Sequence, residues 1–110
     1  MAGKQEKLVV EWTKTAEIQF FHILNYWTER NKSTRYAENL TELVWERTEF
    51  IAENPYASIE IVLQDVRKAT LGHFSIFYRI GESKILIMAF WDNRQDPEKL
   101  YSILKNDNFR

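Results

Sequence analysis

Cysteine is absent from this chain of 110 residues. Disulfides and thiolate metal sites are therefore excluded, and the composition makes no demand for an oxidising compartment. The longest apolar run, residues 85–91, is far shorter than the roughly 20 residues of a membrane-spanning helix. The opening MAGKQEKLVVEW lacks the hydrophobic stretch of a signal peptide. We therefore expect a cytoplasmic protein that makes no membrane contact.

An excess of either charge is also missing. The chain has 15 Lys and Arg against 16 Asp and Glu, a net charge of −1. Proteins that bind nucleic acid avidly usually carry a basic excess, so the balance argues against that class, although a local basic cluster stays possible. The two histidines lack metal-ligand spacing, and no Gly-rich phosphate loop occurs. We expect no metal and no cofactor.

What is present is an ordinary globular composition, with 45% hydrophobic and 28% charged residues. A chain of this length buries roughly two-thirds of its unfolded surface, which suffices for one core. No repeat, low-complexity segment or internal boundary interrupts it. The prediction is a single domain over residues 1–110.

Residues 63–92 are expected to form three consecutive antiparallel strands. Polar and apolar side chains alternate over residues 74–80, residues 81–84 form a turn, and residues 85–91 form a short apolar run. We expect residues 70–72 to make a three-residue hairpin loop that Gly72 closes in the left-handed conformation.

The preceding residues are mostly helical. A strand at residues 7–12 is followed by a helix with an apolar stripe over residues 16–27, capped by Thr13 or Thr15. A second helix over residues 34–52 stops at Pro55, and residues 96–97 begin a short C-terminal helix. The fold class is α+β, in the order β-α-α-β-β-β, with an antiparallel helical hairpin packed on an antiparallel sheet of about four strands.

The three-residue loop places Arg67, Ser75 and Phe90 in one row of the sheet. One face is then mixed, and it is the expected place for chemistry or a partner; it carries Asp65, Arg67, His73, Ser75, Phe77, Arg79, Leu86, Met88, Phe90 and Asp92. The other face should receive the helices: Val66, Phe74, Ile76, Tyr78, Ile80, Ile85, Ile87, Ala89 and Trp91. A loop of two or four residues would move Arg67 to the other face.

Several candidate residues allow two interpretations. Ile18, Phe21 and Trp45 lie off the helix stripes, as partly covered residues or as a partner interface. His73 is a general base oriented by Asp92, or an exposed turn histidine paired with that acid. Arg67 either has a functional role or forms a structural salt bridge to Asp65 or Asp92. Arg94 either contributes to the site or joins a local charge network with Asp92 and Asp96.

The order of elements and several segments resemble the RelE/ParE superfamily of toxins of type II toxin–antitoxin systems, over about residues 7–104. The matching segments are VEWTKTA, YWTERNKSTRYAENL, the NP stop, DVRK, SIFYRI and WDNRQDPEKL, and the last is most similar to the ParE-like, plasmid-stabilisation branch. The resemblance implies a growth-inhibiting toxin that a cognate antitoxin wraps and neutralises, as a hetero-oligomer or with self-association.

Branches of the superfamily act differently. RelE-like members cleave ribosome-bound mRNA without a metal, whereas ParE-like members bind DNA gyrase. Carried over to this chain, a ribonuclease would use Arg67, Arg94 and Tyr101, with His73 as a further candidate. An arginine expected early in the second meander strand is replaced by Ser75, and the chain ends Asn108-Phe109-Arg110 without the His-Tyr pair of another nuclease branch.

Three hypotheses follow. The favoured one is a ParE-like toxin that binds a macromolecular target such as gyrase. The second is a RelE-like mRNA endoribonuclease, and the third is a non-toxic binding scaffold of the same fold. Target or antitoxin contacts are assigned to six residues: Arg79, Phe90, Asp92, Trp45, Ile18 and Phe21.

Overall fold

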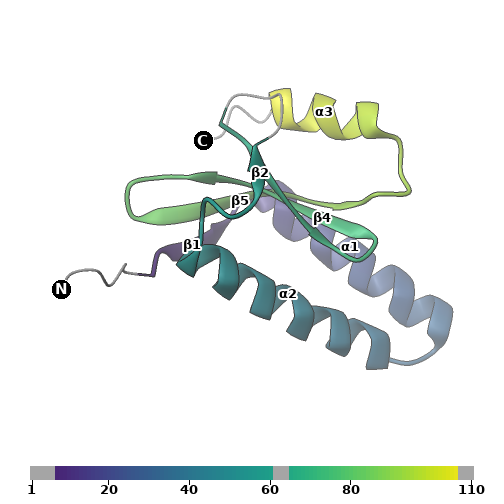
Figure 1. Cartoon of the computed structure of the whole chain (residues 1–110). Coiled ribbons are helices and arrows are strands. Elements are labelled where there is room, and N and C mark those ends of the chain that lie inside the picture. Colours follow the sequence, from purple (N-terminus) through teal and green to yellow (C-terminus); the bar gives the residue numbers. More distant parts are fainter. Residues whose placement is uncertain (1–6, 61–64, 107–110) are drawn as a thin grey trace.

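The computed structural model of the chain describes residues 7–60 and 65–106 (Figure 1). The elements, in chain order, are β1 (Val9–Trp12), α1 (Lys14–Asn31), α2 (Arg35–Glu53), β2 (Ile59–Glu60), β3 (Arg67–Leu71), β4 (Phe74–Ile80), β5 (Lys84–Asp92) and α3 (Pro97–Asn106). Residues 63 and 64, expected to begin the meander, and the C-terminal residues 107–110 lie outside the described ranges. Within those ranges, no helix is long and apolar enough to cross a membrane.

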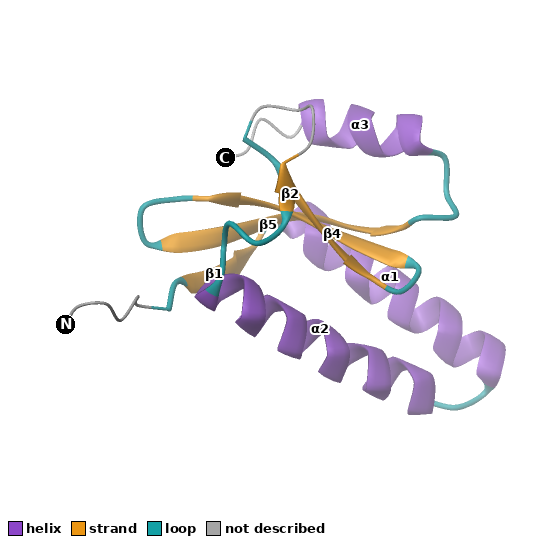
Figure 2. Ribbon diagram, in the orientation of Figure 1, coloured by secondary structure: helices purple, strands orange, loops and turns teal. Residues whose placement is uncertain are grey.

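The described strands form a five-stranded sheet in the order β1-β5-β4-β3-β2. β1 pairs with β5 in parallel, and the other neighbours are antiparallel. The hairpin of α1 and α2 covers one face, and α3 lies across the other (Figure 2). The predicted α+β order is confirmed. The sheet, predicted to be antiparallel, also contains the parallel pair of β1 and β5, and the two-residue β2 is added at its edge.

The helix ends follow local signals in the sequence. The Thr13 side chain accepts a hydrogen bond from the Ala16 amide (3.1 Å), so Thr13 rather than Thr15 is the cap of α1. Asp96 accepts from the Glu98 amide (3.0 Å) at the start of α3, as expected. α1 ends at Asn31, and Lys32, which caps it, has a left-handed backbone (φ 55°).

The turn between β3 and β4 corrects the predicted register. Leu71 pairs with Phe74, so the turn has the two central residues Gly72 and His73 rather than three. Gly72 has a φ of 62°, which suits the first central position of a two-residue hairpin. Arg67 consequently pairs with Tyr78 instead of Ser75. It therefore lies on the face of the sheet that α1 and α2 cover.

A bulge in β5 makes a second correction. Phe77 pairs with Ala89 and Tyr78 with Ile87, which leaves Met88 as an extra residue. Beyond it the alternation is inverted. Phe90 therefore packs in the core under α1 and α2, whereas Ala89 and Trp91, predicted to face those helices, pack with α3.

The face predicted to be mixed is a second core beneath α3. Leu100 and Leu104 of α3 cover it. Val66, which was predicted on the helix-hairpin face, is also part of this core. Its buried floor consists of Val66, Phe77, Met88, Ala89 and Trp91. α3 therefore closes this part of the face, whereas Arg79 and Leu86 at its other end are partly exposed and line a cavity of about 400 Å³ with Asp65.

Candidate functional site

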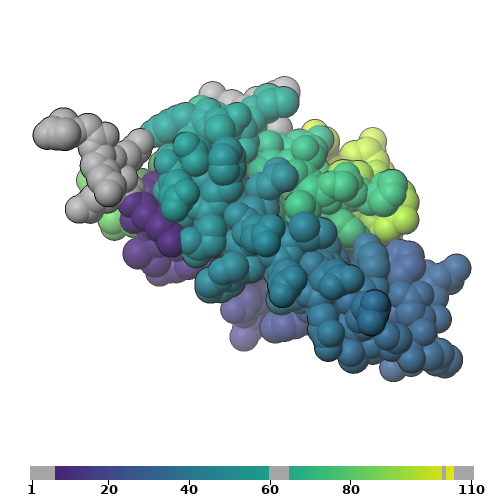
Figure 3. All heavy atoms as spheres, turned by 60° about the horizontal axis from the view of Figure 1, so that its bottom comes forward, coloured from purple at the N-terminus to yellow at the C-terminus, as the bar shows by residue number. Residues whose placement is uncertain are grey.

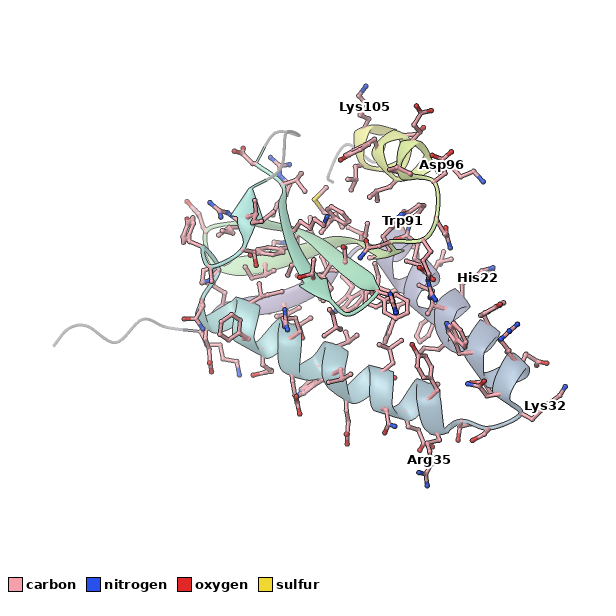
Figure 4. The ribbon with its side chains drawn as sticks, turned by 45° about the vertical axis from the view of Figure 1, so that its right-hand side comes forward. His22, Lys32, Arg35, Trp91, Asp96 and Lys105 are labelled. Carbon is pink, nitrogen blue, oxygen red and sulfur yellow. The ribbon has the colours of Figure 1, made fainter. Side chains whose placement is uncertain are left out.

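Two grooves open beside α1. The first, called here the β5 groove, has a volume of about 680 Å³ and runs between α1 and the end of β5. Its lining residues are Ile18, Gln19, His22, Ile23, Tyr26, Trp27, Arg30, Phe90, Trp91, Asp92, Arg94 and Gln95. In Figure 4, His22 on α1, Trp91 near the end of β5 and Asp96 at the start of α3 follow one another along this side of the molecule.

The β5 groove exists because β1 is shorter than β5. β1 ends at Trp12, opposite Ile87, so α1 rather than a strand borders the rest of β5. The Gln19 side chain accepts a hydrogen bond from the Phe90 amide (2.9 Å), and the Thr13 hydroxyl contacts the Met88 carbonyl (3.3 Å). Side chains of α1 thus satisfy backbone groups that a neighbouring strand would otherwise pair.

An arginine fork lies at the far end of this groove. The Arg94 side chain donates from Nε to Asp92 Oδ1 and from a terminal nitrogen to Oδ2, both at 2.8 Å. The Arg94 amide donates to Oδ1 at 3.0 Å. The hydrogen bonds from the guanidinium hold the pKa of Asp92 below its usual range, against the opposing effect of burial. Both groups are therefore ionised at neutral pH, and the guanidinium is held in one orientation.

Trp27 joins the fork to the helical hairpin. The guanidinium carbons of Arg94 and Arg30 lie 5.8 and 6.0 Å from the Trp27 ring centre, which is within the range of cation–π attraction. The rings of Tyr26 and Tyr36 each lie 5.1 Å from that of Trp27. Two cations and three aromatic rings are therefore gathered at one end of the β5 groove.

The second groove, called here the β1 groove, has a volume of about 610 Å³ and follows the edge strand β1 across α1 and α2. Its lining residues are Lys7, Leu8, Val9, Val10, Trp12, Glu17, Phe20, Phe21, Thr41, Val44, Trp45, Thr48 and Glu49. The side chains of Val9, Phe21 and Trp45 are each more than half exposed. Figure 3 shows β1 (purple) at the surface beside the helices. An edge strand next to exposed apolar side chains is a surface that natural proteins usually cover.

The family described as the ParE toxin of the type II toxin–antitoxin system, parDE, matches residues 10–97, which is most of the chain. The chain belongs to the ParE toxin family. The predicted resemblance to the RelE/ParE superfamily of type II toxins is thus confirmed.

A solved structure of the chromosomal ParDE TA system from P. aeruginosa has a similar fold to this ParE-family chain. The TM-score is 0.66, the sequence identity is 19%, and the match covers 76% of this chain and 94% of that one. At this identity the likeness concerns the fold alone. No curated protein sequence matches the chain.

Arg67, a predicted site residue of this ParE-family chain, secures a loop. Its guanidinium donates to the Ser58 carbonyl at 2.5 Å and lies 5.0 Å from the Tyr56 ring centre. The neighbouring Tyr78 hydroxyl donates to the Pro55 carbonyl at 2.7 Å, and burial raises the pKa of Tyr78. These contacts give Arg67 a structural role in holding residues 55–58 against the sheet.

The two predicted cations do not converge. Arg67 is opposite Tyr78, whereas Asp92, the partner of Arg94, is opposite Phe74. These two positions on β4 are separated by about 13 Å, at roughly 3.3 Å per residue. Arg67 and Arg94 therefore do not lie in one site.

The residues that line the β5 groove do not include His73, Tyr101, Arg79 or Ser75. His73 is exposed in the β3–β4 turn, and Tyr101 is exposed on α3. Arg79 lies 3.6 Å from the Asp65 carboxylate. Ser75 is buried, and its hydroxyl donates to the Asn93 side chain at 2.7 Å. Among the described residues, no three His, Asp or Glu side chains gather closely enough to hold a metal ion.

The exposed apolar residues divide between the two grooves. Phe21 and Trp45 line the β1 groove, whereas Ile18 lines the β5 groove with Asp92 and the buried Phe90. Sequence reasoning missed the cluster around Trp27, because Trp27 was assigned to the sheet-facing stripe of its helix. The available signal was Arg30, which lies three residues after Trp27 and one turn after Tyr26.

Proposed function

We propose that this ParE-family chain inhibits growth as the toxin of a type II module with a role in plasmid stabilisation. It acts in the cytoplasm by binding a macromolecular target such as DNA gyrase. A cognate antitoxin neutralises it by covering the β1 groove. The single observation that carries the antitoxin assignment is the set of exposed apolar side chains of Val9, Phe21 and Trp45 beside an edge strand.

The β1 groove suits a segment that becomes ordered on binding. A chain laid along β1 would pair with its free edge, and its apolar side chains would fill the space between Phe21 and Trp45. Aromatic residues are enriched where interfaces contribute most to affinity. Among the described residues that line the groove, Lys7 and Glu49 form the one ion pair, so most of the binding free energy should come from apolar burial.

Binding of a target is supported over cleavage of RNA by the dispersal of the candidate catalytic groups. A metal-free ribonuclease needs a base, an acid and cations around one phosphate. In the described structure Arg67 is engaged with the loop at Ser58, Arg94 with Asp92, and Ser75 with Asn93. Ser75 also replaces the arginine that the ribonucleases are expected to have in this strand. Loss of even one transition-state donor typically lowers the rate by a factor on the order of 10²–10³.

Induced expression, with and without the protein encoded by the adjacent reading frame, tests this proposal. The chain alone should arrest growth, and co-expression of the partner should restore it. A supercoiling assay with purified gyrase should show inhibition, while primer extension on cellular mRNA should reveal no new cleavage sites. New cleavage sites would show that the chain acts as a ribonuclease and not by binding a target. Normal growth would show that it is a non-toxic binding scaffold.

A further inference from the structure

We propose that the β5 groove is the surface through which the toxin contacts its target, and that it binds an acidic protein segment with apolar residues beside the acid. This inference rests on the proposed function, because it assigns the toxic interaction to a place on the molecule. It separates that place from the β1 groove assigned to the antitoxin. α1 lies between the two grooves, with Ile18 on one side and Phe21 on the other.

The shape of the β5 groove suits a peptide segment. Ile18, His22, Tyr26 and Arg30 recur at intervals of four residues, so they follow one side of α1. Twelve residues of helix extend about 18 Å at 1.5 Å per residue. This length corresponds to about five residues in extended conformation, at roughly 3.3 Å each.

The chemistry of the groove changes along its length. Ile18, Ile23 and Phe90 make one end apolar. Trp27, Arg30 and Arg94 make the other end cationic and aromatic. An occupant that matches both ends has apolar side chains in one part and a carboxylate in the other.

The cationic end is organised before any partner arrives. Asp92 fixes the orientation of the Arg94 guanidinium, and only 15% of the Asp92 side chain is exposed, compared with 49% for Arg94. The part of this ion pair that contacts solvent is therefore mainly the Arg94 guanidinium. A preorganised arginine loses less side-chain entropy on binding than a free one. Arg30, on the other side of the Trp27 ring, adds a second positive charge.

The charges of the two grooves favour different partners. The β1 groove is lined by Lys7, Glu17 and Glu49, and Lys7 is paired with Glu49, so it offers an acidic segment no attraction. In the β5 groove the lining charges are Arg30, Arg94 and Asp92, with His22 beside them. A protein segment is favoured over a nucleic acid because the chain as a whole has a net charge of −1.

Two pairs of substitutions test the separation of the grooves. One variant carries Tyr26→Ala and Arg30→Glu in the β5 groove, and its matched control carries Phe21→Asp and Trp45→Ala in the β1 groove. All four side chains are exposed, so both variants should keep the melting temperature of the parent. Growth arrest, inhibition of gyrase supercoiling and affinity for the adjacent-frame protein are measured for each.

We expect the β5-groove variant to lose growth arrest and to inhibit gyrase about 30-fold less well, as is typical when interface hot spots are removed. It should still bind the adjacent-frame protein as the parent does. The β1-groove variant should show the reverse, with full growth arrest that the partner no longer relieves. Arg30→Lys, which keeps the charge, should retain most of the activity.

A β5-groove variant as toxic as the parent would overturn the inference while leaving the proposed function intact. Loss of toxicity accompanied by loss of binding to a labelled oligothymidylate would overturn the assignment of a protein segment. If the parent chain itself fails to arrest growth, the proposed function fails, and this inference fails with it.

Discussion

Asp92 and Arg94 form a two-pronged ion pair across a single intervening residue, with both hydrogen bonds at 2.8 Å. The pair directs the guanidinium towards the Trp27 ring of α1, 5.8 Å away. The end of β5 is thereby linked to the helical hairpin that packs on the sheet. This relationship makes one end of the β5 groove both cationic and rigid.

Substitution Asp92→Asn should make the stability depend less on pH. The pKa of folded Asp92 is lowered from its ordinary value of 3.8, so the ionised carboxylate stabilises the fold above that pH. This stabilisation is lost as the pH falls through the lower folded pKa. The difference in free energy of unfolding between parent and Asp92→Asn should therefore be full near about pH 7 and shrink below about pH 4.

Urea denaturation across this pH range measures the difference. The same substitution in an Arg94→Ala background is the control, and there the pH-dependent difference should be smaller because the hydrogen bonds that lower the Asp92 pKa are gone. A difference that stays constant down to about pH 3 would contradict the assignment.

Arg67 and Arg94 should contribute independently to stability. Arg67 pairs with Tyr78 of β4, whereas Asp92, the partner of Arg94, pairs with Phe74 at the start of β4. Residues that far apart usually show additive effects within about 0.5 kcal/mol. We expect the double variant Arg67→Ala, Arg94→Ala to lose the sum of the two single losses in urea denaturation. The pair Asp92→Asn and Arg94→Ala, which are in contact, should deviate from additivity. Strong coupling between the two arginines would contradict the observed register.

Gly72→Ala should destabilise the β3–β4 hairpin. Gly72 has a φ of 62°, and an added Cβ would meet no atom within 4 Å, so the cost arises from the backbone alone, at about 1–2 kcal/mol. Gly81→Ala is the matched control, since its Cβ would make only ordinary contacts at 3.5 Å. Thermal denaturation of both variants measures the contrast. Equal melting temperatures would argue for a different turn.

Ile87→Ala should cost roughly 2–5 kcal/mol in free energy of unfolding. Ile87 is completely buried in the core between the sheet and the helical hairpin. Val9→Ala on the neighbouring strand is the control, because Val9 is 62% exposed and surface changes usually stay within about 0.5 kcal/mol. Urea denaturation of the two variants measures the difference. A variant Ile87→Ala that unfolds like the parent would place the residue outside the core.

Elements whose signals are local could be predicted from the sequence. The cap at Thr13, the start of α3 at Asp96 and the apolar stripes of α1 and α2 involve residues within a few positions of one another. The exposure of Ile18, Phe21 and Trp45 followed from the same spacing. The antiparallel order of β3, β4 and β5 followed from their short connections, whereas the parallel pairing of β1 with β5 was not predicted.

The faces of the sheet were decided by tertiary structure. Side chains alternate with a period of two, so a shift of one residue moves a whole strand segment to the other face. The two-residue turn at Gly72 and the bulge at Met88 are such shifts, and they relocated Arg67, Phe90 and Trp91. Neither has a distinctive local sequence, because Gly72 suits two turn lengths and the run around Met88 is apolar on both faces.

The grooves also depend on contacts between distant segments. Arg94 is far from Trp27 and Arg30 in the sequence, but both arginines lie close to the Trp27 ring in the structure. They meet because β1 ends opposite Ile87 and α1 lies along the rest of the β5 edge. Local spacing determined which residues of this ParE-family chain would be helical and which helical side chains, such as Ile18, Phe21 and Trp45, would be exposed. Non-local pairing determined which exposed residues share a surface, because that depends on where each strand ends and on the register in which it pairs.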